Sequence, residues 1–266
     1  MNHGRGARRA ADTVVPLVIA LLALVAWEVL VRWREVPAYI LPAPSVVART
    51  LVADWGILWP ALLVTLHVTL LALLVSVVGG VGLAFLFTLS PWVERSLFPF
   101  AVILQVTPII AIAPLVLIYA PNTLTALLLC AWIVAFFPIL SNTVTGLRSA
   151  DRNLQDLFTL YGASRWQRLR HLLAPSALPY FLAGLKIAGG LSLIGAVVAE
   201  FAAGTSGQES GLAYRILEAS FRLNVARMFA ALALVSLTGI AIFLAFDALS
   251  RALLGRWHES EMGPGS

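Results

Sequence analysis

Residues 61–88 read ALLVTLHVTLLALLVSVVGGVGLAFLFT, a run without any Asp, Glu, Lys or Arg. A helix needs about 20 mostly apolar residues to cross the hydrocarbon core of a bilayer. Five further stretches meet the same requirement, and they are residues 13–31, 97–119, 123–147, 179–201 and 226–250. None of the six alternates apolar and polar residues as a transmembrane strand does. The sequence therefore predicts an all-α, polytopic membrane protein with six transmembrane helices.

The composition of the whole chain excludes most soluble classes of protein. Of its 266 residues, 60% are hydrophobic and 12% are charged, whereas soluble domains average about 45–50% apolar and about 25% charged residues. A soluble enzyme and a disordered chain therefore fit poorly. The net charge of +5 does not indicate nucleic-acid binding, because the basic residues are scattered between apolar runs. A single cysteine, Cys130, excludes a disulfide framework and a cysteine metal site, and we expect no bound metal.

The distribution of arginines predicts the orientation of the chain. We expect one membrane domain at residues 13–250, with tails at 1–12 and 251–266. An even number of spans places both tails and the long segment 148–178 on one side. That side carries eleven arginines and the other side carries six, and basic loops are typical of the cytoplasmic face. Both termini are therefore expected in the cytoplasm, at the plasma (inner) membrane of a bacterium.

The segment 148–178 is too polar to span the membrane and reads RSADRNLQDLFTLYGASRWQRLRHLLAPSAL. Apolar side chains fall at helical spacing in its first half, and these are Leu154, Leu157, Phe158 and Tyr161. Gly162 then breaks the helix, and Ser164 can cap a second helix that stops at Pro175. The pattern predicts a compact unit that docks onto another protein. An amphipathic hairpin lying on anionic lipid is the alternative interpretation.

The same segment resembles the cytoplasmic signature of binding-protein-dependent ABC importer permeases, which is E-A-A, three residues, Gly, nine residues and I-x-L-P. Asp156 stands at the glutamate position, Gly162 follows six residues later, and Pro175 stands at the proline position. The departures are Asp156 for glutamate, Leu157 and Phe158 for the two alanines, and Ala174 for leucine. Other stretches look like the sulfonate, taurine and nitrate branch of these permeases, and they are LYGAS at 160–164, LPYFLAGLKIA at 178–188, AVVAEF at 196–201, GLAY at 211–214 and RWHE at 256–259.

The resemblance implies a type I importer permease that works by alternating access and is not itself an enzyme. Its implied partners are ABC ATPase subunits, an extracytoplasmic solute-binding protein, a second permease copy and membrane lipid. ATP and Mg would be used by the ATPase subunits, and this chain would bind no cofactor. The sequence itself agrees that this chain does not bind ATP through a phosphate loop. Such a loop needs G-x-x-x-x-G-K-[ST], and the only lysine, Lys186, lies between Leu185 and Ile187. The residues expected to couple to the ATPase are Asp156, Leu157, Phe158, Tyr161, Gly162, Ala163, Ser164 and Pro175.

A second candidate site lies in the predicted fifth span, where small residues recur at every fourth position. They are Gly184, Ala188, Ser192 and Ala196, with Glu200 next in line. Close helix packing explains such a stripe, and the resemblance adds that this face lines the translocation path at a dimer axis. Both interpretations can hold together. Lys186 either extends to the cytoplasmic interface or contacts an anion on the path. Glu200 either pairs with Arg215 or Arg222 or belongs to an external gate.

The remaining intramembrane charges predict no catalysis or proton relay. Glu28 with Arg32, and Asp247 with Arg251, form acid-first pairs near span ends and are interpreted as anchors. An ATP-independent channel or secondary carrier is the main alternative function, and a membrane-embedded enzyme is a weaker one because no carboxylate pair or histidine cluster is present. The resemblance leaves two classes of solute open, which are sulfonate-, taurine- or nitrate-like anions and heteroaromatic vitamin precursors such as thiamine pyrimidine or riboflavin.

Overall fold

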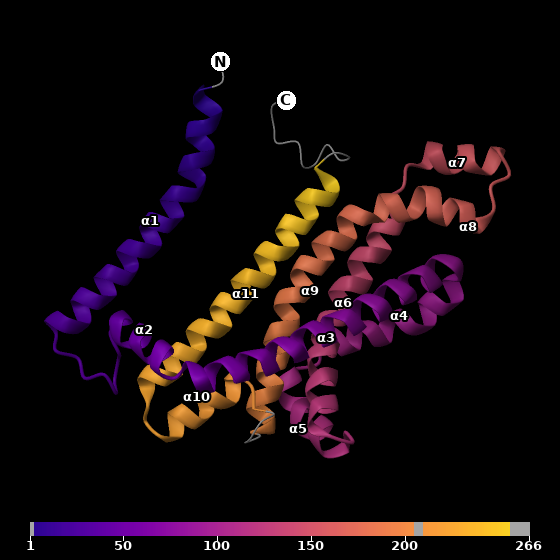
Figure 1. Cartoon of the computed structure of the whole chain (residues 1–266). Coiled ribbons are helices and arrows are strands. Elements are labelled where there is room, and N and C mark those ends of the chain that lie inside the picture. The colour runs from indigo at the N-terminus through magenta and orange to yellow at the C-terminus, as the bar shows by residue number, and fades with distance from the viewer. Residues whose placement is uncertain (1–2, 205–209, 256–266) are drawn as a thin grey trace.

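A computed structural model of the chain describes residues 3–204 and 210–255, and the side chains from Val14 onward. All regular structure in these residues is helical (Figure 1). The first half contains α1 (His3–Trp33), α2 (Pro44–Ala53), α3 (Trp55–Leu89), α4 (Pro91–Val106), α5 (Ile109–Tyr119) and α6 (Thr123–Arg148). The second half contains α7 (Arg152–Leu160), α8 (Arg165–Arg168), the π-helical turn η1 (Leu169–Leu173), α9 (Ala174–Ala203), α10 (Leu212–Phe221) and α11 (Val225–Leu254).

The long apolar helices confirm a polytopic all-α membrane protein. Among the described residues, five helices are long and apolar enough to span a membrane, and a bent pair brings the number to six if it counts as one span. The apolar part of α1, Val14–Trp33, matches the predicted span 13–31. Helix α1 already begins at His3, inside the segment predicted as a tail, and α11 continues to Leu254. The motif at 256–259 lies outside the described residues.

The predicted third span, 97–119, is not one straight helix. Helix α4 already starts at Pro91, with Ser90 as its N-cap. Between α4 and α5 the helix direction bends by 105°. The break lies at Thr107 and Pro108, where Thr107 is extended (ψ 123°). A residue before proline is pushed out of the helical region, and the proline itself lacks the N–H that would continue the helix. Pro99, Pro114 and Pro138 lie inside helices that continue past them.

The centre of the fold is formed by α6 and α9, which pack along each other, with α3 across both. Small residues bring the two helix axes together. A Cβ atom built on Gly195 would lie 2.8 Å from Ala131 Cα, and one built on Gly184 would lie 2.8 Å from the Pro138 carbonyl oxygen. Only glycine allows this contact, as is typical of helix packing in lipid.

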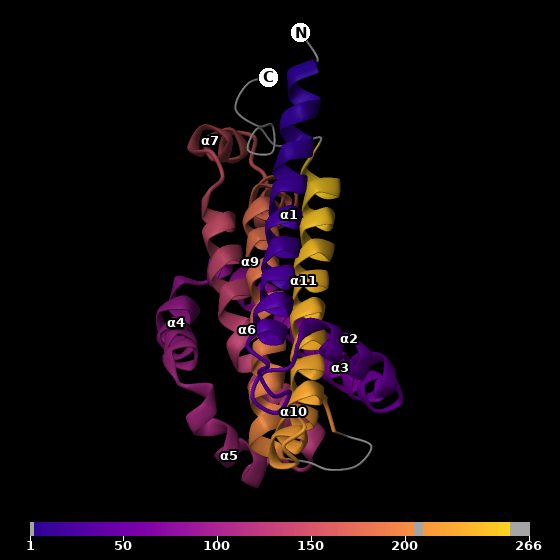
Figure 2. The ribbon, with the colours of Figure 1, turned by 90° about the vertical axis from the view of Figure 1, so that its left-hand side faces the viewer.

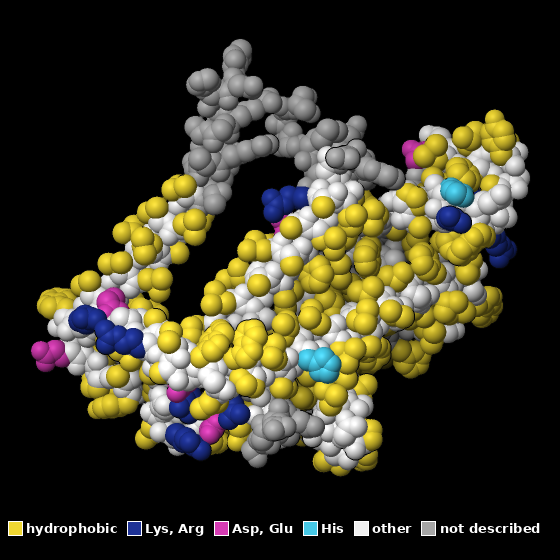
Figure 3. All heavy atoms as spheres, viewed as in Figure 1, with side chains coloured by type: hydrophobic (Ala, Val, Ile, Leu, Met, Phe, Trp, Pro, Cys, Tyr) yellow, Lys and Arg dark blue, Asp and Glu magenta, His cyan; other side chains and the backbone are white. Residues whose placement is uncertain are grey.

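The helix ends and the short helices lie at two opposite ends of the molecule. The start of α1, the end of α11 and the α7–α8 segment lie at one end, and α5 and α10 lie at the other (Figures 1 and 2). Charged side chains gather toward these ends, and the helices between them are covered by hydrophobic side chains (Figure 3). Helix α1 lies apart from the central helices, with only 6% of its span buried.

Candidate functional site

The segment predicted to dock onto a partner folds into two helices joined at Gly162, as expected. Asp151 caps α7 through Oδ1, which accepts hydrogen bonds from the backbone N–H groups of Asn153 (2.7 Å) and Leu154 (3.3 Å). Gly162 has φ +64°, a left-handed conformation that glycine adopts without a steric cost. Ser164 then caps α8 in a capping box with Gln167. We call residues 151–175 the coupling unit.

The predicted end of the second helix at Pro175 is wrong. Helices α8, η1 and α9 follow each other without a break, so that one helix runs from Arg165 to Ala203. The wider π-helical turn at Leu169–Leu173 directly precedes Pro175, which sits in the first turn of α9. Inside a continuous helix a proline removes one backbone hydrogen bond and its ring crowds the carbonyl of the preceding turn, and the wider π-helical turn directly before Pro175 makes room for it. The coupling unit is therefore the direct extension of a membrane-spanning helix.

The apolar residues of the coupling unit surround a groove between α7 and the start of the long helix. Its volume is about 450 Å³, and it is lined by Leu157, Phe158, Tyr161, Ala163, Gln167 and His171. Four of the eight residues predicted for coupling thus meet at one place. Tyr161 is 83% exposed, although it lies outside the spanning part of the chain. Exposed apolar surface beside a groove is typical of interaction sites, and docking of a partner here stays a prediction. Asp156 is exposed and does not line the groove.

The small-residue stripe of α9 is buried inside the single chain. Ala188, Ser192 and Ala196 are fully buried, and the Ser192 hydroxyl donates a hydrogen bond to the Thr69 carbonyl oxygen at 2.7 Å. Gly184 lies against α6. In this arrangement the stripe packs α9 on α3 and α6, and its role in lining a translocation path stays a prediction.

Lys186 forms an ion pair that the sequence analysis did not predict. Its Nζ lies 2.7 Å from Asp247 Oδ1, and Arg251 contacts the other oxygen of the same carboxylate at 2.6 Å. Asp247 is thus more than the partner of Arg251, because it joins α9 to α11. Lys186 and Arg251 share the single negative charge of Asp247, so the three side chains together keep a positive charge. A contact between Lys186 and a transported anion stays a prediction.

The shared carboxylate predicts unequal effects of removing either partner. Lys186→Met should lower the melting temperature of the purified protein only slightly, because Asp247 keeps Arg251. Asp247→Leu should lower it more, since Lys186 is then left without its partner inside the span. The combined variant should melt above Asp247→Leu. Equal melting temperatures for Lys186→Met and Asp247→Leu would show that the pair does not hold α9 to α11.

Glu200 holds the N-terminus of α10 and does not pair with Arg215 or Arg222, which was one of its two predicted roles. Its other predicted role, in an external gate, stays a prediction. Both arginines pair with Glu218 instead, at 2.9 and 3.0 Å. Glu200 is 1% exposed, and its Oε2 accepts a hydrogen bond from the Ala213 N–H at 3.0 Å. A buried carboxylate at this position is favoured by the unpaired N–H groups of the helix start.

The start of α10 is held by a second hydrogen bond and by a close backbone contact. The Leu212 N–H donates to the Thr65 hydroxyl oxygen of α3 at 2.9 Å. A Cβ atom built on Gly211 would lie 2.1 Å from the Glu200 carboxylate, so that only glycine fits there. The motifs AVVAEF and GLAY, which are apart in the sequence, thus form one structure, the Glu200 site, made of Thr65, Glu200 and Gly211–Ala213.

Two further polar contacts at this end were missed. Arg227 of α11 contacts Asp54 with two nitrogens, at 2.6 and 3.1 Å, and Glu28 accepts from both the N–H and the hydroxyl of Ser45, at 2.9 and 2.8 Å. Glu28 therefore ties α1 to α2 in addition to pairing with Arg32. Asp54 and Arg227 are 173 residues apart, so no local pattern could have joined them.

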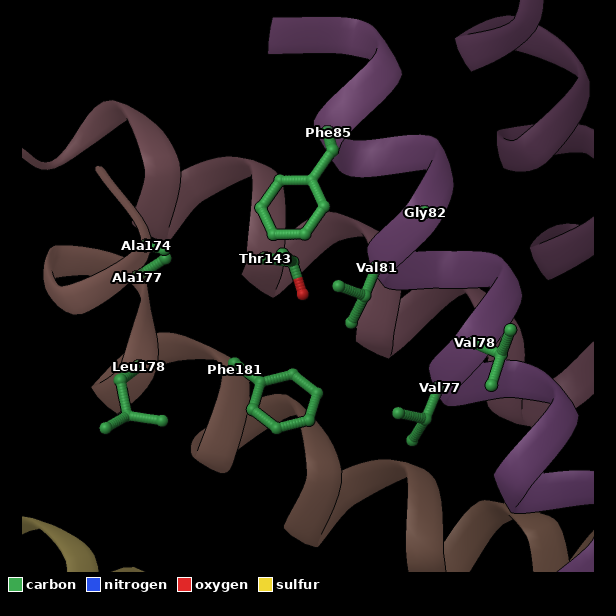
Figure 4. Close-up of a pocket in the computed structure, with 10 residues that line it drawn as sticks. All are labelled: Val77, Val78, Val81, Gly82, Phe85, Thr143, Ala174, Ala177, Leu178 and Phe181. Atoms are coloured by element: carbon green, nitrogen blue, oxygen red, sulfur yellow. The ribbon is translucent and has the colours of Figure 1, made fainter. Parts of the chain in front are cut away.

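A large cavity lies between α3 and the start of α9 and is almost entirely apolar (Figure 4). Its volume is about 480 Å³, and Val81, Phe85, Leu178 and Phe181 are among the lining residues. The Thr143 hydroxyl is the one side-chain polar group in the lining, and it donates to the Ile139 carbonyl oxygen of its own helix. A site of this kind has no group that could orient a charged solute.

Comparison with known proteins gives matches over most of the chain. A family model described as "Binding-protein-dependent transport system inner membrane component" matches residues 76–257. The formylaminopyrimidine transport permease protein ThiX of Halalkalibacterium halodurans is 33% identical, over 93% of this chain and 97% of the relative. The riboflavin transport system permease protein RibX of Chloroflexus aurantiacus is 36% identical, over 91% and 90%. An inward-facing structure of the MetNI methionine ABC transporter shares the fold, with a TM-score of 0.65 and 19% identity over 75% of this chain and 97% of that chain.

Proposed function

This chain belongs to the binding-protein-dependent transport system inner membrane components, and from that premise we propose which solute it carries and how it is arranged. It is a multi-pass membrane protein and the permease subunit of an ABC importer, not an enzyme. The family predicted from the spacing of Asp156, Gly162 and Pro175 is thus confirmed. An ABC ATPase and a solute-binding protein are the partners of such a subunit.

We propose that the solute is a small heteroaromatic vitamin precursor. The observation that carries this proposal is the pair of relatives named for formylaminopyrimidine and riboflavin, which are 33% and 36% identical over more than nine tenths of this chain. One feature of the structure supports it against an anionic solute. The large cavity near the start of α9 is lined almost entirely by apolar residues. The solute-binding protein would deliver the compound to the external end of the permease.

We propose further that two copies of the chain form the transport unit, with both termini in the cytoplasm. The start of α1, the end of α11 and the coupling unit share one end of the molecule (Figure 1), and the arginine distribution favours the cytoplasm for that end. The cavity of the single chain offers no polar path, so a second copy would complete one. The coupling unit would dock into the ATPase through the groove at Leu157, Phe158 and Tyr161, and ATP with Mg would bind in the ATPase alone.

Uptake by cells that contain the chain, its ATPase and its binding protein tests this function. Labelled formylaminopyrimidine or riboflavin should enter in an ATP-dependent manner, and taurine should not. The ATPase should co-purify with the chain, and the pure chain should neither bind nor hydrolyse ATP. Taurine uptake would contradict the proposed solute while leaving the importer intact. Uptake that continues after ATP depletion would indicate a channel or a secondary carrier.

A further inference from the structure

A second cavity lies beneath the coupling unit, where the end of α3 meets α7, α8 and η1. Its volume is about 350 Å³, and it is lined by Thr88, Leu89, Gln155, Arg165, Arg168, Leu169 and Leu173. It shares no lining residue with the groove at Leu157 and Phe158. The coupling unit thus has two different surfaces, an apolar groove and a basic cavity.

The two guanidinium groups of this cavity have no acidic partner in the part of the chain that the structure describes. None of the ion pairs there includes Arg165 or Arg168. The acidic groups nearest in the sequence are engaged elsewhere or exposed. Glu94 pairs with Arg148, Asp151 caps α7, and Asp156 faces solvent. Two arginines that line one cavity therefore leave room for an anion.

The position of the cavity decides what kind of anion fits. Leu89 and Thr88 end α3, which is one of the membrane-spanning helices, so the cavity opens near the boundary between hydrocarbon and water. Trp92, three residues beyond the end of α3, is 79% exposed, and exposed tryptophan is typical of that boundary. Leu89, Leu169 and Leu173 add an apolar part to the lining. A basic group of side chains with an apolar side at this depth matches the phosphate and glycerol region of a phospholipid.

We propose that this cavity binds the headgroup phosphate of an anionic phospholipid. Arg165 and Arg168 hold the phosphate, Gln155 offers a polar neighbour, and the leucines contact the start of the acyl chains. The bound lipid fixes the coupling unit to the membrane surface from below. The apolar groove remains available to the ATPase. The proposal concerns binding alone and does not depend on the solute or on the direction of transport.

The test measures which lipids the full-length chain retains from vesicles that contain equal amounts of phosphatidylglycerol and phosphatidylcholine. Native mass spectrometry after detergent extraction should show phosphatidylglycerol bound in preference. The variant Arg165→Gln/Arg168→Gln should lose retained phosphatidylglycerol by about fivefold for each arginine, or roughly thirtyfold for both. The matched control is Arg152→Gln/Arg170→Gln, which removes two exposed arginines of the same segment that do not line the cavity. It should retain the lipid as the unchanged chain does.

Five outcomes would overturn the proposal. The first is equal retention of both lipids by the unchanged chain, and the second is an equal loss in the control variant. The third is binding of millimolar inorganic phosphate without lipid, which would indicate a site for a soluble anion. The fourth is loss of ATPase co-purification in Arg165→Gln/Arg168→Gln with lipid retention unchanged, which would assign the arginines to the ATPase contact. The fifth is a lowered melting temperature of Arg165→Gln/Arg168→Gln with unchanged lipid retention. The two arginines would then only stabilise the C-terminal end of α3 by their positive charge.

Discussion

Replacing Gly211 with alanine should push the Glu200 carboxylate away from the N-terminus of α10 and strongly destabilise the end of the permease that contains α10. The added methyl group would lie 2.1 Å from the carboxylate Oε1, far inside van der Waals contact. To make room, the carboxylate must give up its hydrogen bond from the Ala213 N–H while it remains buried. Losing a buried hydrogen bond to a charged group costs about 1.5–3 kcal/mol. We expect a loss of this size in the free energy of unfolding.

A double-mutant comparison separates this clash from a general effect of the methyl group. In a Glu200→Ala background the methyl group has space, so Gly211→Ala should cost much less there than in the unchanged protein. Gly190→Ala is the control, because a Cβ atom at Gly190 meets nothing within 4 Å. Unfolding curves in mild detergent provide the measurement. An equal cost of Gly211→Ala in both backgrounds would show that Glu200 does not occupy the position described.

Phe158→Asp should abolish ATP-driven uptake while the chain still inserts normally into the membrane. Phe158 lines the apolar groove of the coupling unit, and a carboxylate there would be buried without a partner when the ATPase docks. An unpaired buried charge costs several kcal/mol, enough to reduce association by more than a hundredfold. Phe158→Leu keeps the groove apolar and should retain most uptake. Co-purification of the ATPase and solute uptake in reconstituted vesicles measure both effects, and wild-type values for Phe158→Asp would separate this groove from coupling.

The turn at Gly162 allows an independent check of the same site. Its φ of +64° is unfavourable for a β-branched residue but tolerated by asparagine. Gly162→Val should therefore misplace Tyr161 and uncouple hydrolysis from uptake, whereas Gly162→Asn should behave nearly as the unchanged chain does. If the two variants transport equally well, the left-handed turn is not needed for coupling.

The membrane spans and the coupling unit could be predicted from the sequence because both depend on local patterns. The length of an apolar run determines a span, and the capping residues at Asp151 and Ser164 and the turn at Gly162 act within a few residues. The prolines were harder to interpret. Pro108 breaks a helix, whereas Pro99, Pro114 and Pro138 do not, and nothing in their immediate neighbours distinguishes these cases.

The polar contacts of the site could not be predicted, because they join distant parts of the chain. Lys186 and Asp247 are 61 residues apart, and Thr65 and Leu212 are 147 residues apart. The sequence marked Glu200 as unusual only because a charge ended an apolar run. Its partner is a backbone N–H group rather than an arginine. Almost every residue has a backbone N–H group, so the sequence does not show which one donates the hydrogen bond. The glycine at position 211 was the one sequence feature that could have indicated a close contact there, and a glycine alone is a weak indication.

The unbroken helix from Arg165 to Ala203 has a mechanical consequence. Its 39 residues extend over about 58 Å at 1.5 Å per residue, with the coupling unit at one end and Glu200 near the other. If the helix tilted as a rigid body by about 10° around its middle, its two ends would move by about 5 Å in opposite directions. A displacement of the coupling unit by a docked ATPase would then displace the first turn of α10 by a similar distance, without a relay through loops.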